Sequence, residues 1–122
     1  MEIETGMDKD QRGVMAGGLS KLLADTYLLY LKTQNSHWNV TGPEFYSLHL
    51  LFQSQYEEMA EAIDEIAERV RALGFFIEGT SQAFSNLSTI HEDDRVLPKH
   101  ELLEQLVKGH EVVIREARTL SD

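Results

Sequence analysis

Four side chains able to bind a metal lie in the middle of the chain: His37, His49, Asp64 and Glu68. Imidazole nitrogen and carboxylate oxygen suit Fe(II), Mn(II) or Zn(II), and iron is favoured where positions stay open for an oxidant. The sequence has no cysteine, so thiolate sites are excluded and any metal must be held by nitrogen and oxygen. These four residues can act together only if the fold brings them together.

The first element that must position them is a helix around residues 19–31, where apolar residues recur at steps of three and four. Its start is obscured by three glycines between residues 13 and 18, which lower helix propensity but can also let a neighbouring helix approach closely. Gly42 and Pro43 end the pattern. We expect Pro43 to open the next helix and Thr41 to cap it.

A second helix is predicted from about Glu44 to Ala72, followed by a stop at Gly74. At 1.5 Å per residue it would be about 43 Å long, the length of a bundle helix. Its apolar stripe consists of Phe45, Leu48, Phe52, Met59, Ile63, Ile66, Val70 and Leu73, with Gln55 filling the gap.

Two further helices are expected after residue 74. A short one begins at Thr80 or Ser81, and a long one runs from Pro98 to about Leu120 with apolar residues three and four apart. No strand pair, repeat or low-complexity tract is visible. The chain is therefore predicted to be a single all-α domain, residues 1–122.

The second helix carries an acidic run without basic partners. Between Lys32 and Arg69 the only basic side chains are histidines, and like charges four residues apart on a helix repel by a few tenths of a kcal/mol, on the order of 0.2–0.5 per pair. Solvation of an exposed face is one explanation, and metal binding is another. The acidic residues are Glu44, Glu57, Glu58, Glu61, Asp64, Glu65 and Glu68.

His49 and Asp64 cannot share a metal within one chain, because they would lie about 22 Å apart along the helix axis. Two antiparallel copies of this helix that cross near Tyr56 and Glu57 would set His49 of one copy opposite Asp64 of the other. The short turn after His37 returns that residue to the side of the second helix. A two-fold dimer with two equivalent sites is therefore expected.

The stretch "YLLYLKTQNSHWNVTGPEFYSLHLLFQSQYEEMAEAIDEIAERVRALG" resembles the Dps family of ferritin-like proteins, which protect DNA in starved or oxidatively stressed cells. The resemblance covers about residues 15–121, and its most specific parts are the four spaced ligands with "HWNVTG" and "RALG". It implies a four-helix bundle with a short helix between the second and third long helices. It also implies a hollow shell of twelve subunits.

The same resemblance implies that His37 and His49 of one subunit form a ferroxidase centre with Asp64 and Glu68 of a two-fold mate. Fe(II) would be oxidised there, preferably by hydrogen peroxide, and Fe(III) stored in the shell. Zn(II) or Mn(II) could substitute for iron. Trp38 could intercept a stray oxidising equivalent or fill the dimer interface.

This chain departs from the family pattern because no counterpart of the fourth bundle helix is present. Three long helices alone would expose an apolar stripe along their length. By the same analogy, the residues that line the iron-entry pores are missing, which bears on whether this length of chain forms a shell.

Charge bears on the choice between function classes. The chain has 21 acidic and 11 basic residues, which disfavours nonspecific binding to DNA or to anionic membranes. The sequence also shows no signal peptide or membrane-spanning run, so a cytoplasmic protein is expected. Protection of DNA would then come from removal of iron and peroxide. A DNA-compacting stress protein and a non-catalytic helical assembly protein remain as alternatives.

The other histidines are given structural roles. His110 is expected to be a hydrogen-bonded core residue, and His91 and His100 to be exposed. Tyr27, Tyr30 and Met59 are interpreted as packing residues.

Overall fold

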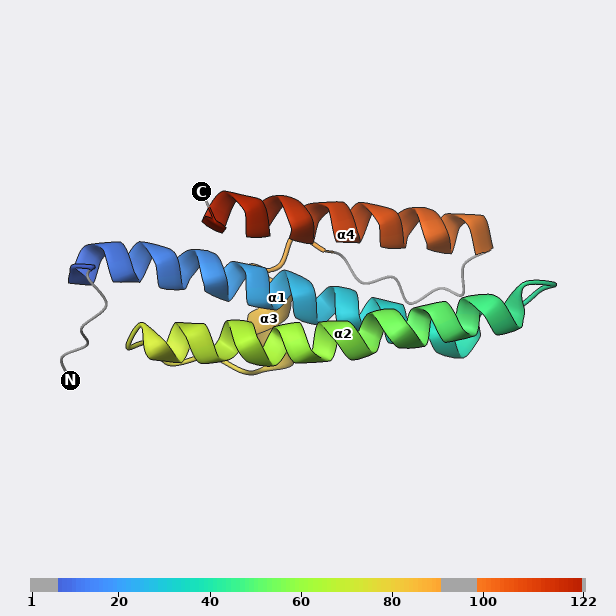
Figure 1. The fold of residues 1–122 in the computed structure, drawn as a ribbon, viewed down its shortest axis with the longest axis horizontal. Helices are drawn as coiled ribbons and strands as arrows, with labels where there is room; N and C mark the ends of the chain where they lie inside the picture. The colour runs from blue at the N-terminus through green and yellow to red at the C-terminus, as the bar shows by residue number, and fades with distance from the viewer. Residues whose placement is uncertain (1–6, 91–98, 122) are drawn as a thin grey trace.

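The computed structural model describes residues 7–90 and 99–121, and these form helices without any strand. The order is α1 (Lys9–Asn39), α2 (Phe45–Ala72), α3 (Ser81–Leu87) and α4 (Lys99–Ser121). α1 is the central helix: α2 lies antiparallel along one side, α4 covers another, and the short α3 packs on a third (Figure 1). The predicted all-α architecture is confirmed in these residues, including the short helix between the second and third long helices.

α1 begins ten residues before its apolar pattern. Asp8 caps the helix by accepting a hydrogen bond from the Gln11 N–H, and the Gln11 side chain accepts in return from the Asp8 N–H. A Cβ on Gly18 would lie 2.5 Å from Leu120 Cδ2, so this glycine permits the close approach of α4. Gly17 has no atom within 4 Å of such a Cβ and makes no comparable contact.

The turn between α1 and α2 corrects two expectations. Pro43 lies in the turn rather than opening the helix, because the Phe45 N–H bonds to the Gly42 carbonyl at 3.1 Å and the helix starts only at Phe45. The N-cap is Glu44, without any side-chain cap, so Thr41 does not cap the helix. Gly42 has φ 103°, which an L-residue adopts only with strain.

The end of α2 follows the prediction closely. Gly74 has φ 95° and follows the C-cap Leu73; the N–H of Phe75 bonds to the Val70 carbonyl and that of Gly74 to the Arg71 carbonyl. This is a Schellman motif. Thr80 caps α3 through its side chain, as expected. The expected helix start at Pro98 lies outside the described residues.

The core consists of two apolar clusters along α1. One gathers around the middle and C-terminal part of α1, and the other around its N-terminal half. The buried members of the first are Leu28, Leu29, Val40, Phe52, Met59, Ile90 and Leu106; those of the second are Ala16, Leu19, Leu22 and Val70.

A groove of about 550 Å³ remains open among the three long helices. Apolar side chains from α1, α2 and α4 dominate its lining. The lining residues are Met15, Leu19, Leu22, Ile66, Arg69, Ala72, Leu73, Ala117 and Leu120. No helix in the described residues is long and apolar enough to cross a bilayer.

Candidate metal centre

Two of the four predicted ligands meet within one chain. His37 lies in the last turn of α1 and His49 in the first turns of α2, and the tight turn at Gly42 folds them onto each other. Their ring centroids are 3.6 Å apart and the ring planes differ by 22°. His37 is only 7% exposed and His49 is half-buried. The prediction that the turn brings these imidazoles together is confirmed.

Each imidazole is held by the backbone of the other residue. His37 Nδ1 lies 2.6 Å from the His49 carbonyl oxygen, and His49 Nδ1 lies 2.8 Å from the His37 carbonyl oxygen. A carbonyl oxygen can only accept, so both Nδ1 atoms must carry the proton and donate it. In the neutral rings this leaves the Nε2 lone pairs available, which is the arrangement of metal-binding histidines whose orientation is fixed by a second hydrogen bond.

Local helix chemistry explains this pairing. The carbonyl of His37 belongs to the last turn of α1, where carbonyls have no partner within their own helix. The His49 ring supplies that partner. One hydrogen bond thus completes the end of α1 and also fixes the orientation of the ring.

Aromatic side chains enclose the imidazole pair. Phe45 stacks on His49 with centroids 5.3 Å apart, and Tyr56 meets His37 edge to face, also at 5.3 Å. These contacts restrict rotation of both rings. Trp38 is 62% exposed and, in the described part of the chain, makes no ring contact with either histidine.

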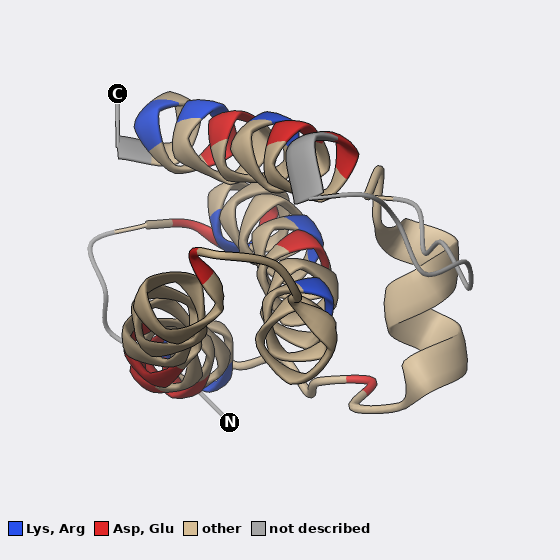
Figure 2. Cartoon of the chain, turned by 90° about the vertical axis from the view of Figure 1, so that its right-hand side faces the viewer, with Lys and Arg blue, Asp and Glu red and all other residues tan. Residues whose placement is uncertain are grey.

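The two predicted carboxylates lie elsewhere. Asp64 and Glu68 are both exposed, and they follow His49 along the same helix. Within residues 7–90 and 99–121 of one chain, no three histidine or acidic side chains lie close enough to hold a metal. Figure 2 shows acidic residues on the part of α2 that faces away from α4. The acidic run therefore points outward in a single chain, as the dimer hypothesis requires.

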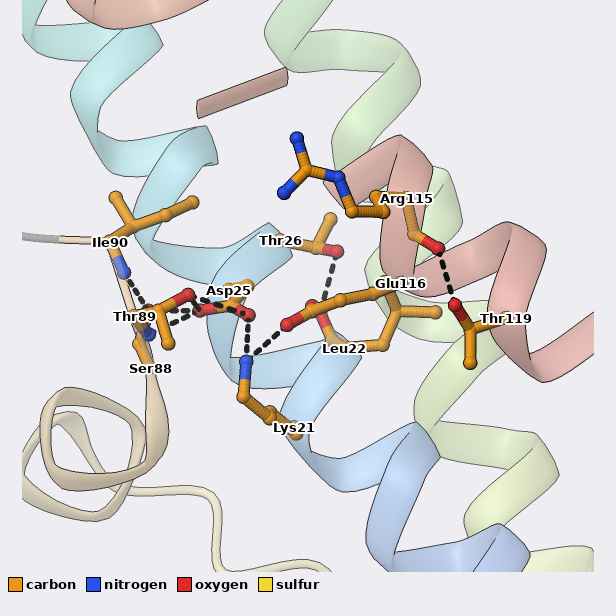
Figure 3. Close-up of polar contacts among 10 residues, drawn as sticks. All are labelled: Lys21, Leu22, Asp25, Thr26, Ser88, Thr89, Ile90, Arg115, Glu116 and Thr119. Atoms are coloured by element: carbon orange, nitrogen blue, oxygen red, sulfur yellow. Dashed lines mark hydrogen bonds and ion pairs between the residues drawn. The ribbon is translucent and has the colours of Figure 1, made fainter. Parts of the chain in front are cut away.

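A second polar cluster was not foreseen from the sequence (Figure 3). Asp25, fully buried in α1, bonds to Lys21 at 2.8 Å, and accepts from the Ser88 hydroxyl and from the Thr89 N–H at 2.7 Å. Lys21 also pairs with Glu116 of α4. The cluster ties α1 to α4 and to the segment that follows α3.

The charges of this cluster shift the pKa values of all three ionisable members. Burial alone would raise the pKa of Asp25, but hydrogen bonds with Glu116, Lys21, Ser88 and Thr89 lower it to about 2. Burial would lower the pKa of Lys21, yet its two carboxylate partners raise it. Burial, together with the hydrogen bond to Asp25, raises the pKa of Glu116.

His110 differs from its expected role. It is half-buried on α4, and its buried Nε2 atom has no hydrogen-bond partner among residues 7–90 and 99–121. Burial lowers its pKa and favours the neutral ring. His91 and the side chain of His100 lie outside the described residues. Met59 is buried and Tyr30 packs against the core, as predicted. Tyr27 also packs, against Tyr30 and Phe84, although it is 37% exposed.

The chain is similar to known proteins in sequence and in fold. The model of the ferritin-like domain family, Ferritin, matches residues 16–122. A low temperature-induced protein of Nostoc sp. is 42% identical over 117 residues, which are 95% of this chain and 65% of that protein. DNA protection during starvation protein 2 of Bacillus anthracis is 36% identical over 100 residues, covering 82% of this chain and 68% of that protein.

Two solved structures share the fold over nearly the whole chain. DpsC from Streptomyces coelicolor has a TM-score of 0.93 and 30% identity, over 98% of this chain and 70% of that one. A Dps protein from Vibrio cholerae has a TM-score of 0.90 and 27% identity, over 98% of this chain and 76% of that one. That protein is described as a member of a broad superfamily of ferritin-like diiron-carboxylate proteins. The chain thus spans about two thirds of the length of several such proteins, and it belongs to the Dps family of ferritin-like proteins.

Proposed function

We propose that this chain contributes to an iron-oxidising centre shared between two subunits. The observation that carries the proposal is the imidazole pair: two stacked rings, each with Nδ1 bound to a carbonyl and each with Nε2 left for a metal. Asp64 and Glu68 of a two-fold mate would complete the ligand set. Neutral imidazoles accept Fe(II), and carboxylates stabilise the Fe(III) that forms.

The surface around the pair supports a subunit contact. Exposed apolar side chains flank the α1–α2 turn, and such a group on one surface is typical of an interaction site. They are Trp38, Phe45, Tyr46, Leu50 and Leu51. A second copy laid antiparallel along α2 would cover this group and bring its own acidic face to the imidazoles. Trp38 would then lie in the interface, beside the metal.

The reaction would couple two irons to one peroxide. Two Fe(II), one H₂O₂ and two protons give two Fe(III) and two water molecules, so no radical leaves the site. Fe(III) would then be stored in a hollow oligomer, a dodecamer in the full-length family pattern. Zn(II) or Mn(II) would occupy the same ligands without this chemistry.

DNA would be protected indirectly, by removal of iron and peroxide. Direct DNA binding is not part of the proposal, because 21 acidic residues against 11 basic ones oppose contact with phosphates. The Bacillus anthracis relative is named for DNA protection during starvation, and that name is compatible both with direct DNA binding and with indirect protection.

Anaerobic titration with Fe(II), followed by one equivalent of peroxide per two irons, tests the proposal. The wild-type chain should saturate at two irons per site or fewer and then consume the peroxide rapidly. The His37→Ala/Asp64→Ala variant should do neither, whereas Glu65→Gln, an exposed neighbour on α2, should behave as wild type. Equal behaviour of all three proteins would overturn the proposal.

A further inference from the structure

A continuous line of aromatic rings leads from the imidazole pair to the surface. Tyr56 lies 5.3 Å from His37, Tyr30 lies 6.0 Å from Tyr56, and Tyr27 lies 6.0 Å from Tyr30, all measured between ring centroids. Tyr27 in turn contacts Phe84 of α3 at 5.0 Å. Three of the four tyrosines of the chain thus belong to one row of contacts that starts at the candidate metal centre.

The chemistry changes along this row. A phenol can lose one electron together with its hydroxyl proton, whereas the phenylalanine at the far end has no such proton to lose. The row therefore has a chemical end at Tyr27, which is 37% exposed. Tyr56 and Tyr30 are half-buried between α1 and α2.

The middle member is suited to pass a proton. Gln34 Nε2 donates a hydrogen bond to Tyr30 Oη at 3.1 Å. Because the phenol oxygen accepts this bond, its own O–H is not needed for it and remains free to move. The same bond from Gln34 would stabilise the oxygen after the proton has left.

Paired irons avoid radicals, but a site that holds a single iron does not. One Fe(II) and one H₂O₂ give Fe(III), hydroxide and a hydroxyl radical, and this one-electron oxidant arises beside His37. Any half-loaded site faces this reaction. A reductant within the protein is then needed close to the imidazole pair.

We propose that Tyr56, Tyr30 and Tyr27 form a relay that carries this oxidising equivalent from the metal centre to the surface; the inference rests on the proposed function. Tyr56 gives a hydrogen atom to the hydroxyl radical, which becomes water, and a Tyr56 phenoxyl radical remains. Tyr30 then reduces Tyr56, and Tyr27 reduces Tyr30, one hydrogen atom at each step. A thiol in solution finally restores Tyr27 and leaves as a thiyl radical.

The relay is tested in the 122-residue chain loaded with one Fe(II) per site and mixed with peroxide. Rapid freezing and electron paramagnetic resonance detect the tyrosyl radical, and iron oxidation is followed in the same samples. The wild type should show the radical, and Tyr56→Phe, which keeps an aromatic ring at this position, should lose most of it. Tyr46→Phe is the matched control, because Tyr46 is 71% exposed on α2 and outside the row.

The role of Tyr27, the last tyrosine of the relay, is tested by the decay of the radical. In Tyr27→Phe the radical should form as in wild type but decay more slowly when a thiol is added. A tyrosyl signal equal in wild type and Tyr56→Phe, or one lost only in Trp38→Phe, overturns the relay and leaves the proposed function intact. A wild-type chain that fails to oxidise iron at all overturns both.

Discussion

Two polar groups are built into α1, one at Asp25 and one at His37, and they differ in how far this chain satisfies them. Asp25 accepts hydrogen bonds from its own helix and from the segment after α3, and Lys21 links it to α4. Among the described residues, the rings of His37 and His49 form hydrogen bonds only through Nδ1. A buried carboxylate whose two oxygens are both bonded within the subunit stabilises the fold, whereas an imidazole pair left open at an exposed apolar surface is suited to bind something from outside.

The largest expected effect is on the Asp25 cluster. Asp25→Ala should lower the free energy of unfolding by about 3–5 kcal/mol, because it leaves Lys21 half-buried with fewer acceptors and breaks the link to the segment after α3. Glu104→Ala is the matched control: it breaks the exposed i,i+4 pair with Lys108, worth at most about 1 kcal/mol. Urea unfolding followed by circular dichroism measures both. Equal losses would mean that the Asp25 cluster is not structural.

The imidazole pair of His37 and His49 should show the reverse pattern, with a large effect on metal binding and a small effect on stability. His49→Ala should weaken Zn(II) or Fe(II) binding by at least about 100-fold, since even loss of a group that only orients a ligand costs 10–100-fold. Its free energy of unfolding should fall by only about 1 kcal/mol, the worth of one hydrogen bond. Competition with a chromophoric chelator measures the affinity, and Gln53→Ala, one turn further along α2, should bind as wild type.

Acid should weaken the Asp25 cluster in a defined window. The folded pKa of Asp25, about 2, lies below its ordinary value of 3.8, so its stabilisation is present above pH 3.8 and is lost as pH falls towards 2. The loss should amount to about 2 kcal/mol, reduced by the opposite shift of Glu116. Asp25→Asn should remove this slope from the unfolding free energy. If the unfolding free energies of wild type and Asp25→Asn follow parallel curves against pH, this prediction is wrong.

The smallest expected effect concerns the α1–α4 contact beside the Asp25 cluster. Gly17→Ala should stabilise the chain by about 0.5–1 kcal/mol, because it improves helix propensity and its Cβ meets nothing within 4 Å. Gly18→Ala gains the same helix propensity, but its Cβ would press on Leu120. Its free energy of unfolding should therefore be about 1 kcal/mol lower than that of Gly17→Ala. Thermal unfolding of the two variants measures this difference, and identical midpoints would contradict a close contact at Gly18.

The sequence predicted best what depends on local pattern. The apolar period of α2 and the stop at Gly74 gave that helix to within a residue, and the Gly42 turn predicted the meeting of His37 and His49. The start of α1 was missed because packing of α4 against Gly18 outweighs the low helix propensity of glycine.

Long-range polar contacts could not be predicted. Asp25 takes its partners from residues 88, 89 and 116, and no spacing in the sequence relates them. The same holds for His110 Nε2, which has no hydrogen-bond partner in the described part of the chain, because hydrophobic pattern predicts burial but not hydrogen bonds. The roles of Asp64 and Glu68 depend on a second subunit, so they remain predictions.

Subunit complementation tests the shared centre most directly. A His37→Ala/His49→Ala variant and an Asp64→Ala/Glu68→Ala variant are each expected to be inactive in Fe(II) oxidation. When the two are refolded together in equal amounts, half of the dimers are mixed, and each mixed dimer has one complete centre. The proposal therefore predicts recovery of about a quarter of the wild-type centres. A mixture as inactive as its components would contradict a centre shared between subunits.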